Sequence, residues 1–141
     1  MKISNLLFVI NPIAGDIDKE ELQDEIKSTC AEHNLNCTIY RTTGQRDSEE
    51  IKQRMDQHSY DAVFAVGGDG TVSLVGALLI GSNIPLGIIP LGSGNGLSKD
   101  LGIPQDTEEA LQLIHEHVVR SIDTIDLNGQ PSIHLSDLGF N

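Results

Sequence analysis

Short apolar runs alternate with longer amphipathic segments over most of the chain. Leu6–Ile10, Ala62–Val66 and Ile84–Pro90 are almost entirely apolar. Runs of this length are typical of strands that are buried on both faces of a parallel sheet. Asn36–Tyr40 is a further strand segment with fewer apolar positions. The pattern therefore predicts a sheet whose central strands are completely covered.

The segments between these strands carry the signals of helix starts. In each, an acidic residue precedes Glu by three positions, which resembles a capping box; the pairs are Asp18 and Glu21, Asp47 and Glu50, and Asp106 and Glu109. Leu22, Ile26 and Cys30 place an apolar stripe on the first of these helices. Thr71–Ile80 is also long and apolar enough for a helix. Strands alternating with helices predict an α/β fold built on a parallel, doubly wound sheet.

The pattern changes near Val119. Ser121–Leu127 alternates polar and apolar residues, as a half-exposed antiparallel strand does, and Asn128-Gly129 is a strong hairpin signal. Ile133 begins a return strand. The sequence therefore predicts an α/β domain over residues 1–118 and a β-hairpin over residues 119–141. Hairpin strands without a partner sheet would present open edges, which predicts association between chains, for example as a homodimer.

The turn after Ala62–Val66 carries the strongest chemical signal. Gly67, Gly68 and Gly70 allow a ligand to approach the backbone closely, and the helix that follows offers N–H groups and a partial positive charge to phosphate. Asp69 would repel phosphate unless Mg²⁺ lay between them, because Mg²⁺ binds one or two carboxylates together with substrate phosphates. The alternative is a tight turn in which Asp69 is only the N-cap of the helix.

Several loops follow the carboxyl ends of predicted strands. They begin at Asn11, Thr42, Gly67 and Gly92. Ligands of parallel α/β sheets bind beyond these strand ends, so we expect the loops to meet at one edge and form a nucleotide site. Taken alone, Asn11 is better explained as the cap of the turn before Pro12.

Composition excludes several other functions. The chain has 9 Lys+Arg against 21 Asp+Glu, a formal net charge of −12, and lacks the basic footprint of a nucleic-acid-binding protein. Cys30 and Cys37 are too few for a disulfide framework or a zinc site. No apolar run reaches the length of a membrane span, and the start of the chain is unlike a signal peptide. We expect a cytoplasmic protein.

Together these motifs resemble the diacylglycerol kinase catalytic-domain family, which includes bacterial lipid kinases and is related to sphingosine kinases. The resemblance is carried by Asn11-Pro12 with Gly15, Gly67-Gly68-Asp69-Gly70-Thr71, Pro90-Leu91-Gly92-Ser93-Gly94-Asn95, Leu101-Gly102-Ile103-Pro104 and Gly139-Phe140. It implies an ATP-dependent kinase of phospholipid metabolism that transfers the γ-phosphate of ATP, with Mg²⁺, to a lipid hydroxyl. It also implies that this chain is the ATP-binding domain, and that the hairpin leads into a C-terminal β-sandwich domain that is absent from this chain.

The resemblance assigns nucleotide binding to a set of loop residues: Asn11, Thr42, Gly67, Gly68, Asp69, Gly70, Thr71, Ser93, Gly94 and Asn95. Asp69 would act through the Mg²⁺ bound to ATP. The general base is expected beyond Asn141, so this chain alone is expected to be inactive. The lipid would bind through the second domain, with peripheral contact at the inner membrane surface for the full-length protein.

The sequence also departs from the family pattern. Gly96 stands where relatives often have Asp, and Gly44-Gln45-Arg46 stands where many have Gly-His-Ala, so substrate contacts in these loops stay open. Two other functions fit part of the chain. Gly-Gly-Asp-Gly-Thr is shared with NAD kinases, and the chain could be a non-catalytic nucleotide-binding module. The Ser93-Gly94-Asn95 loop after a proline-bounded strand favours the lipid kinase.

Overall fold

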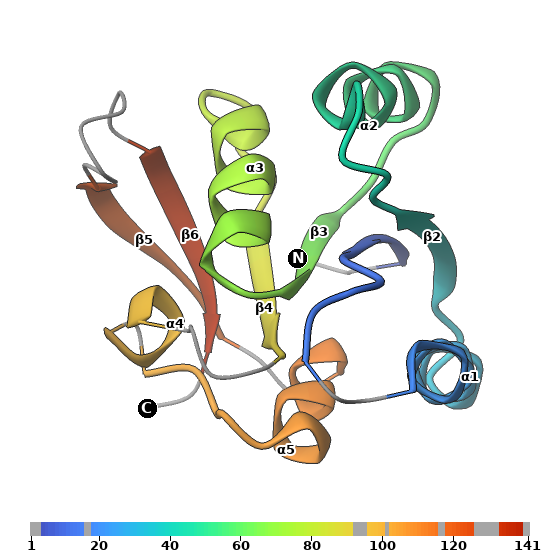
Figure 1. Ribbon diagram of the computed structural model, residues 1–141. Coiled ribbons are helices and arrows are strands. Elements are labelled where there is room, and N and C mark those ends of the chain that lie inside the picture. Colours follow the sequence, from blue (N-terminus) through green and yellow to red (C-terminus); the bar gives the residue numbers. More distant parts are fainter. Residues whose placement is uncertain are drawn as a thin grey trace.

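A computed structural model of the protein describes residues 4–15, 18–91, 96–100, 102–115, 118–125 and 133–139. Its strands are β1 (Asn5–Ile10), β2 (Asn36–Arg41), β3 (Ala62–Gly67), β4 (Leu86–Pro90), β5 (Val118–Ile125) and β6 (Ile133–Gly139). They form one sheet in the order β2-β1-β3-β4-β6-β5. The first four strands are parallel, which confirms the predicted α/β fold with a parallel sheet (Figure 1).

Helices cover both faces of this sheet. They are α1 (Lys19–Glu32), α2 (Asp47–Gln57), α3 (Asp69–Leu79), α4 (Gly96–Asp100) and α5 (Thr107–Leu111), and α5 continues into the 3₁₀ turn η1 (Gln112–Ile114). In Figure 1, α2 and α3 lie on one face while α1 and α5 lie on the other. The chain leaves β1 toward β2 but returns past β1 to β3, so the winding direction reverses between β1 and β3.

The core lies between the central strands and these helices. Every residue of β3 and β4 is buried, as are the residues of β1 after Asn5. The rings of Phe8 and Phe64 stack with their centroids 4.9 Å apart. Gly87 lies against the Phe64 ring, where a Cβ atom would clash with it. The apolar runs in the sequence therefore correspond to strands buried on both faces.

Two of the predicted helix starts have different outcomes. Asp18 is the N-cap of α1, and its Oδ1 accepts hydrogen bonds from the backbone N–H groups of Glu20 at 2.9 Å and Glu21 at 3.4 Å. The prediction for α2 is wrong, because its N-cap is Arg46 and Asp47 is already the first helical residue. Asp47 turns its carboxylate back to the preceding loop, where it accepts from backbone N–H groups.

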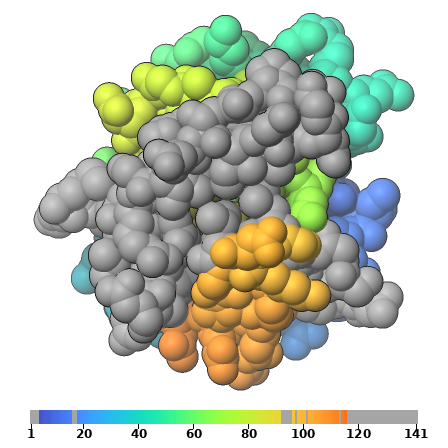
Figure 2. Space-filling view, turned by 90° about the vertical axis from the view of Figure 1, so that its left-hand side faces the viewer, coloured from blue at the N-terminus to red at the C-terminus, as the bar shows by residue number. Residues whose placement is uncertain are grey.

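The segment that contains α4 and α5 follows the sequence prediction more closely. Gly102 ends α4 with a φ of 76°, and Gln105 Nε2 ties the connection by donating to Ser98 Oγ at 3.1 Å and to the Ile103 carbonyl at 2.9 Å. Figure 2 shows α4 and α5, in orange, as one continuous part of this face. Asp106 occupies the N-cap position of α5, as its spacing from Glu109 predicts.

The C-terminal strands pair as the predicted antiparallel hairpin, although the predicted turn at Asn128-Gly129 lies outside the described residues. The hairpin is not without a partner sheet, because β6 runs parallel to β4, with Leu86 paired to Asp137. That finding corrects the expectation that both strands are unpartnered, and β5 alone forms this edge of the sheet. The domain boundary at residue 118 stays a prediction. None of the described helices is long and apolar enough to cross a membrane.

Candidate functional site

A cleft of about 560 Å³ opens at the carboxyl ends of the central strands. It lies where the winding direction reverses between β1 and β3, which is the place where ligands bind in open α/β sheets. Its lining comes from the loops after β1 and β2, from the first residue of α2, from α3 with its N-cap and from Leu91: Asn11, Pro12, Ile13, Ala14, Gly15, Thr42, Thr43, Gly44, Asp47, Gly68, Gly70, Thr71, Leu74 and Leu91. The predicted convergence on one edge is therefore found for the loops that begin at Asn11, Thr42 and Gly67, while Gly92 lies outside the described residues.

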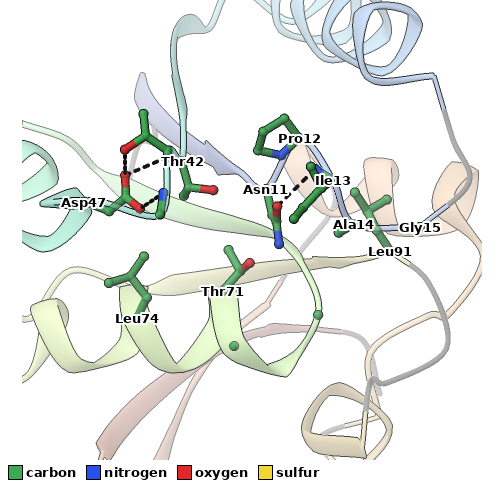
Figure 3. A pocket seen from close by; sticks show the side chains of 14 residues that line it. Asn11, Pro12, Ile13, Ala14, Gly15, Thr42, Asp47, Thr71, Leu74 and Leu91 are labelled. Atoms are coloured by element: carbon green, nitrogen blue, oxygen red, sulfur yellow. Dashed lines mark hydrogen bonds between the residues drawn. The ribbon is translucent and has the colours of Figure 1, made fainter.

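The cleft has two ends. Figure 3 shows Asn11 and Thr71 facing each other across its middle. Thr42, Asp47 and Leu74 lie toward one end, and Gly15 and Leu91 lie toward the other (Figure 3). Because α3 runs from Thr71 toward Leu74, its N-terminus points away from the end at which Asp47 lies.

One wall is the loop that follows β1. The Asn11 N–H donates to the Val66 carbonyl at 3.0 Å, which fixes the loop to the end of β3. Asn11 Oδ1 accepts from the Ile13 N–H at 3.1 Å. The side chain therefore does cap its own turn, as the simpler interpretation of this residue predicts, while the residue also lines the cleft. Ile13 is 88% exposed at the rim.

The floor is the first turn of α3. Gly68 is its N-cap, and the Gly68 carbonyl accepts from the Thr71 and Val72 N–H groups at 3.1 Å each. The N–H groups of the first turn of a helix have no carbonyl four residues earlier within the helix, and the Thr71 N–H uses the Gly68 carbonyl three residues earlier instead. Among the described residues, and leaving aside the backbone of α3 itself, no atom lies within 4 Å of the position that a Cβ atom would take on Gly70. The cleft therefore meets bare backbone at the positive end of a helix, an arrangement that can bind phosphate.

Gly67 supports this floor from behind. A Cβ atom at this position would lie 2.5 Å from Thr71 Oγ1, 3.0 Å from Thr71 Cβ and 3.3 Å from Asn11 Cβ. Thr71 is itself only 6% exposed. The absence of a side chain on Gly67 thus allows Asn11 and Thr71 to approach each other at the middle of the cleft.

The opposite wall is the loop that follows β2. The Thr42 N–H donates to the Ile10 carbonyl at 2.9 Å, which holds the loop to the end of β1. Asp47 Oδ1 accepts from Tyr40 Oη at 2.6 Å and from the Thr43 N–H at 2.9 Å, and Asp47 Oδ2 accepts from the Gly44 N–H at 2.9 Å. Gly44 has a φ of 84°, a conformation that glycine adopts readily.

These hydrogen bonds also shift two pKa values. Desolvation raises the pKa of the Asp47 carboxyl, but the hydrogen bonds from Tyr40, Thr43 and Gly44 outweigh it and leave that pKa below its ordinary value. Burial, and next the hydrogen bond to Asp47, raise the pKa of Tyr40 to about 12. Near neutral pH the pair is therefore an ionised carboxylate that accepts from a neutral phenol.

The predicted site residues are only partly brought together. Asn11, Thr42, Gly68, Gly70 and Thr71 line the cleft, and Gly67 lies directly behind it. Asp69 is not the N-cap of α3, because that position belongs to Gly68. It is also not among the lining residues, and its Oδ2 lies 3.5 Å from the position of a Cβ atom on Gly96. The predicted contacts Ser93, Gly94 and Asn95 lie outside the described residues.

Asp47 and Leu74 are among the lining residues that the sequence did not predict. Asp47 has the spacing of a helix cap, which gave no sign of a place in a cleft. Leu74 belongs to the apolar stripe of α3 and packs partly against the core. Neither position carries a motif, so only the three-dimensional packing of α2 and α3 around the loop after β2 reveals them.

The lining is acidic and lacks a cationic side chain. Among the lining residues that the structure describes, Asp47 is charged and none is Lys or Arg. The described part of the chain also contains no group of three or more side chains that could hold a metal ion by themselves. An anionic ligand would therefore depend on backbone N–H groups and on a cation that it brings with it.

The comparisons with known proteins agree with this architecture. A family model described as the diacylglycerol kinase catalytic domain matches residues 5–127. The chain is 30% identical over 143 residues to a diacylglycerol kinase of Bacillus subtilis, covering 99% of this chain and 46% of that protein. It is 33% identical over 130 residues to sphingosine kinase 1 of Arabidopsis thaliana, covering 84% of this chain and 27% of that protein.

A solved structure is similar as well. The crystal structure of a diacylglycerol kinase from Bacillus anthracis superimposes with a TM-score of 0.76 at 32% identity, covering 92% of this chain and 48% of that chain. The chain thus spans less than half the length of each of these proteins. Because the family model matches most of its residues, the chain belongs to the diacylglycerol kinase catalytic-domain family.

Proposed function

We propose that this chain is the ATP-binding part of a lipid kinase, which transfers the γ-phosphate of ATP to the hydroxyl group of a lipid. The observation that carries the proposal is the cleft between β1 and β3, whose floor is the glycine-rich start of α3. Its volume is typical of small-molecule and cofactor sites. Membership of a kinase family supports ATP as the phosphate donor.

The cleft supports a particular orientation of ATP. The phosphates would bind at the N-terminus of α3, near Gly68 and Gly70, where backbone N–H groups and the helix dipole favour negative charge. The base would then lie one helical turn farther along α3, near Leu74 and the loop after β2. Asn11 and Thr42 would contact the nucleotide from the walls, and Ser93, Gly94 and Asn95 are proposed to close the phosphate end.

Mg²⁺ fits the residues that are present. A lining without Lys or Arg requires another cation to offset the charge of a triphosphate, and Mg²⁺ commonly enters such sites with the phosphates and needs only one or two carboxylates. Asp69 follows the N-cap of α3 and is the proposed carboxylate. Bound Mg²⁺ would stabilise the charge that develops on the transferred phosphoryl group.

The lipid substrate and the membrane belong to the whole protein. We propose that a second domain beyond Asn141 supplies the general base and the lipid site, and that the full-length kinase works at the inner face of the cytoplasmic membrane. The relatives named diacylglycerol kinase and sphingosine kinase act on lipids by their names. An NAD kinase is not favoured by these relatives.

Two experiments test the proposal. Calorimetric titration of the 141-residue chain should detect ATP binding that requires Mg²⁺ and is much stronger than binding of NAD. Incubation of the full-length protein with labelled ATP and a panel of lipids should give a labelled lipid, whereas the 141-residue chain should give none. Failure of the chain to bind ATP, or robust lipid phosphorylation by the chain alone, would contradict the proposal.

A further inference from the structure

We propose that Asp47 is a positioning residue for the nucleoside end of the cleft, where it holds the Thr43-Gly44 backbone in place and keeps phosphate out. The inference rests on the proposed function, because it takes the ligand to be a nucleotide. It goes beyond that function by assigning a role to a residue outside the glycine-rich motifs.

The first support is the number of donors that Asp47 collects. Oδ1 accepts from the Tyr40 hydroxyl at 2.6 Å and from the Thr43 N–H at 2.9 Å, whereas the single proton of the Thr43 hydroxyl, 3.2 Å from Oδ1, has a closer acceptor in the Gln45 carbonyl at 2.8 Å. Oδ2 accepts from the Gly44 N–H at 2.9 Å. All but one of these donors belong to the lining segment Thr43-Gly44. One carboxylate thus fixes the position of two consecutive residues in the wall of the cleft.

The second support is that the hydrogen bonds of Asp47 described above come from outside its own helix. Arg46 is the N-cap of α2, adopts a left-handed conformation with a φ of 57°, and makes no side-chain cap hydrogen bond. An Asp in the first turn often stabilises the helix N-terminus by its charge. Here its oxygens are directed at the loop before the helix instead, which a purely helical role does not require.

The third support is a rigid attachment behind the carboxylate. Tyr40 is buried, and its backbone pairs with Val9 of β1. The Arg54 guanidinium lies over the Tyr40 ring, 4.7 Å from the centroid, and Arg54 also pairs with Glu50 at 3.8 Å. The Tyr40 hydroxyl therefore connects Asp47 to the sheet, so the loop is held relative to β1 and not only to α2.

The charge of Asp47 gives the cleft a direction. The N-terminus of α3 attracts phosphate at the middle of the cleft, and the carboxylate lies on the Leu74 side of that point (Figure 3). A phosphate near Asp47 would meet like charge with no Lys or Arg among the described lining residues to offset it. The Asp47 end therefore suits the uncharged nucleoside part of the ligand, packed against Leu74.

The test compares two ligands and two matched charge changes in the 141-residue chain. Dissociation constants for ATP with Mg²⁺ and for adenosine are measured by NMR titration for the wild type, Asp47→Asn and Glu49→Gln. Glu49 lies in the same helical turn, is 66% exposed in its side chain and pairs with Arg46, but it does not line the cleft. The carboxamide that Asp47→Asn introduces cannot accept from both the Thr43 and the Gly44 N–H groups through separate atoms, because one of its two polar atoms is a donor.

In Asp47→Asn the affinity for both ligands should fall about tenfold, because one hydrogen bond to a charged group is lost. In Glu49→Gln the affinity for both ligands should not change. Hydrogen exchange of the Gly44 amide should also become faster without a matching fall in melting temperature. Unchanged adenosine affinity in folded Asp47→Asn would overturn the inference, as would tighter ATP binding with unchanged adenosine binding, which would indicate a charge effect alone.

Two further outcomes can be distinguished from a failure of the inference about Asp47. A wild-type chain that binds neither ligand would overturn the proposed function itself. If Asp47→Asn does not fold, Tyr40→Phe carries the test, because it removes one donor to Asp47 from outside the cleft lining. Tyr40→Phe should lower the affinity for ATP and for adenosine by the same factor, which should be smaller than the factor expected for Asp47→Asn. Unchanged affinity for both ligands would overturn the role of Asp47.

Discussion

Replacing Gly70 with Ala should separate the stability of the fold from the function of the cleft. Among the described residues outside the backbone of α3, no atom lies within 4 Å of the added methyl group, and Gly70 lies in the first turn of α3 without a positive φ. Ala costs less conformational entropy than Gly in a helix, so the free energy of unfolding should be unchanged or higher by up to about 1 kcal/mol. The melting temperature should therefore stay level or rise by roughly 2–4 °C.

Ligand binding should respond in the opposite direction. Gly70 lines the cleft, so the same methyl group would occupy space that the phosphates of ATP are proposed to use. Forcing an extra methyl group into a filled space costs about 1–3 kcal/mol, which corresponds to a loss of affinity of roughly fivefold to more than a hundredfold. Calorimetric titration with ATP and Mg²⁺, next to thermal unfolding followed by circular dichroism, measures both effects.

Gly67→Ala is the matched control, three residues earlier in the same turn. Its methyl group would lie 2.5 Å from Thr71 Oγ1, so this variant should lose about 1–3 kcal/mol of stability through overpacking. A Gly70→Ala variant that binds ATP as the wild type does would refute the position of the phosphates. Strong destabilisation of Gly70→Ala would instead refute the open space at that position.

Three further variants test other parts of the account. Asp69→Asn should change the free energy of unfolding by no more than about 0.5 kcal/mol, because Gly68 is the N-cap. The lipid kinase rate of the full-length protein should fall by orders of magnitude if Asp69 binds Mg²⁺. A near-normal rate would reject that role. Tyr40 has a raised pKa of about 12, so the neutral phenol stabilises the fold below the ordinary pKa of about 10, and this stability is lost as the pH rises through 12. Alkaline unfolding curves of Tyr40→Phe should lack this loss, and an identical pH profile would count against the hydrogen bond to Asp47. The Tyr60 hydroxyl is buried without a hydrogen-bond partner among the described residues, so Tyr60→Phe should be neutral or stabilising in a denaturant titration, and a loss above about 1 kcal/mol would show that the hydroxyl has a partner.

The fold could be predicted from the sequence because its central strands are buried on both faces. Such strands give continuous apolar runs, and Leu6–Ile10 and Ala62–Val66 agree with β1 and β3 to within one residue at each end. The loops that end these strands could also be predicted to meet, since parallel strands share one carboxyl edge. Asn11, Thr42 and Gly68 are found together at that edge.

The spacing of Asp and Glu in the sequence did not predict which way the Asp side chains point. Asp18 and Asp47 each precede Glu by three positions, yet only Asp18 caps its helix. A short carboxylate can accept from N–H groups on either side of it. The left-handed conformation of Arg46 brings the Thr43 and Gly44 amides within reach of Asp47. That conformation left no mark in the sequence, because Arg rarely adopts it.

The central claim is that the cleft between β1 and β3 binds ATP together with Mg²⁺. The most direct measurement is the mapping of backbone amide shifts in the ¹⁵N-labelled 141-residue chain during titration with ATP and Mg²⁺. The largest shifts should fall on Asn11, on residues 42–44 and on residues 68–71, and NAD at the same concentration should not reproduce them. Absence of shifts there, or shifts confined to the opposite edge of the sheet near Asn36 and Tyr60, would contradict the account.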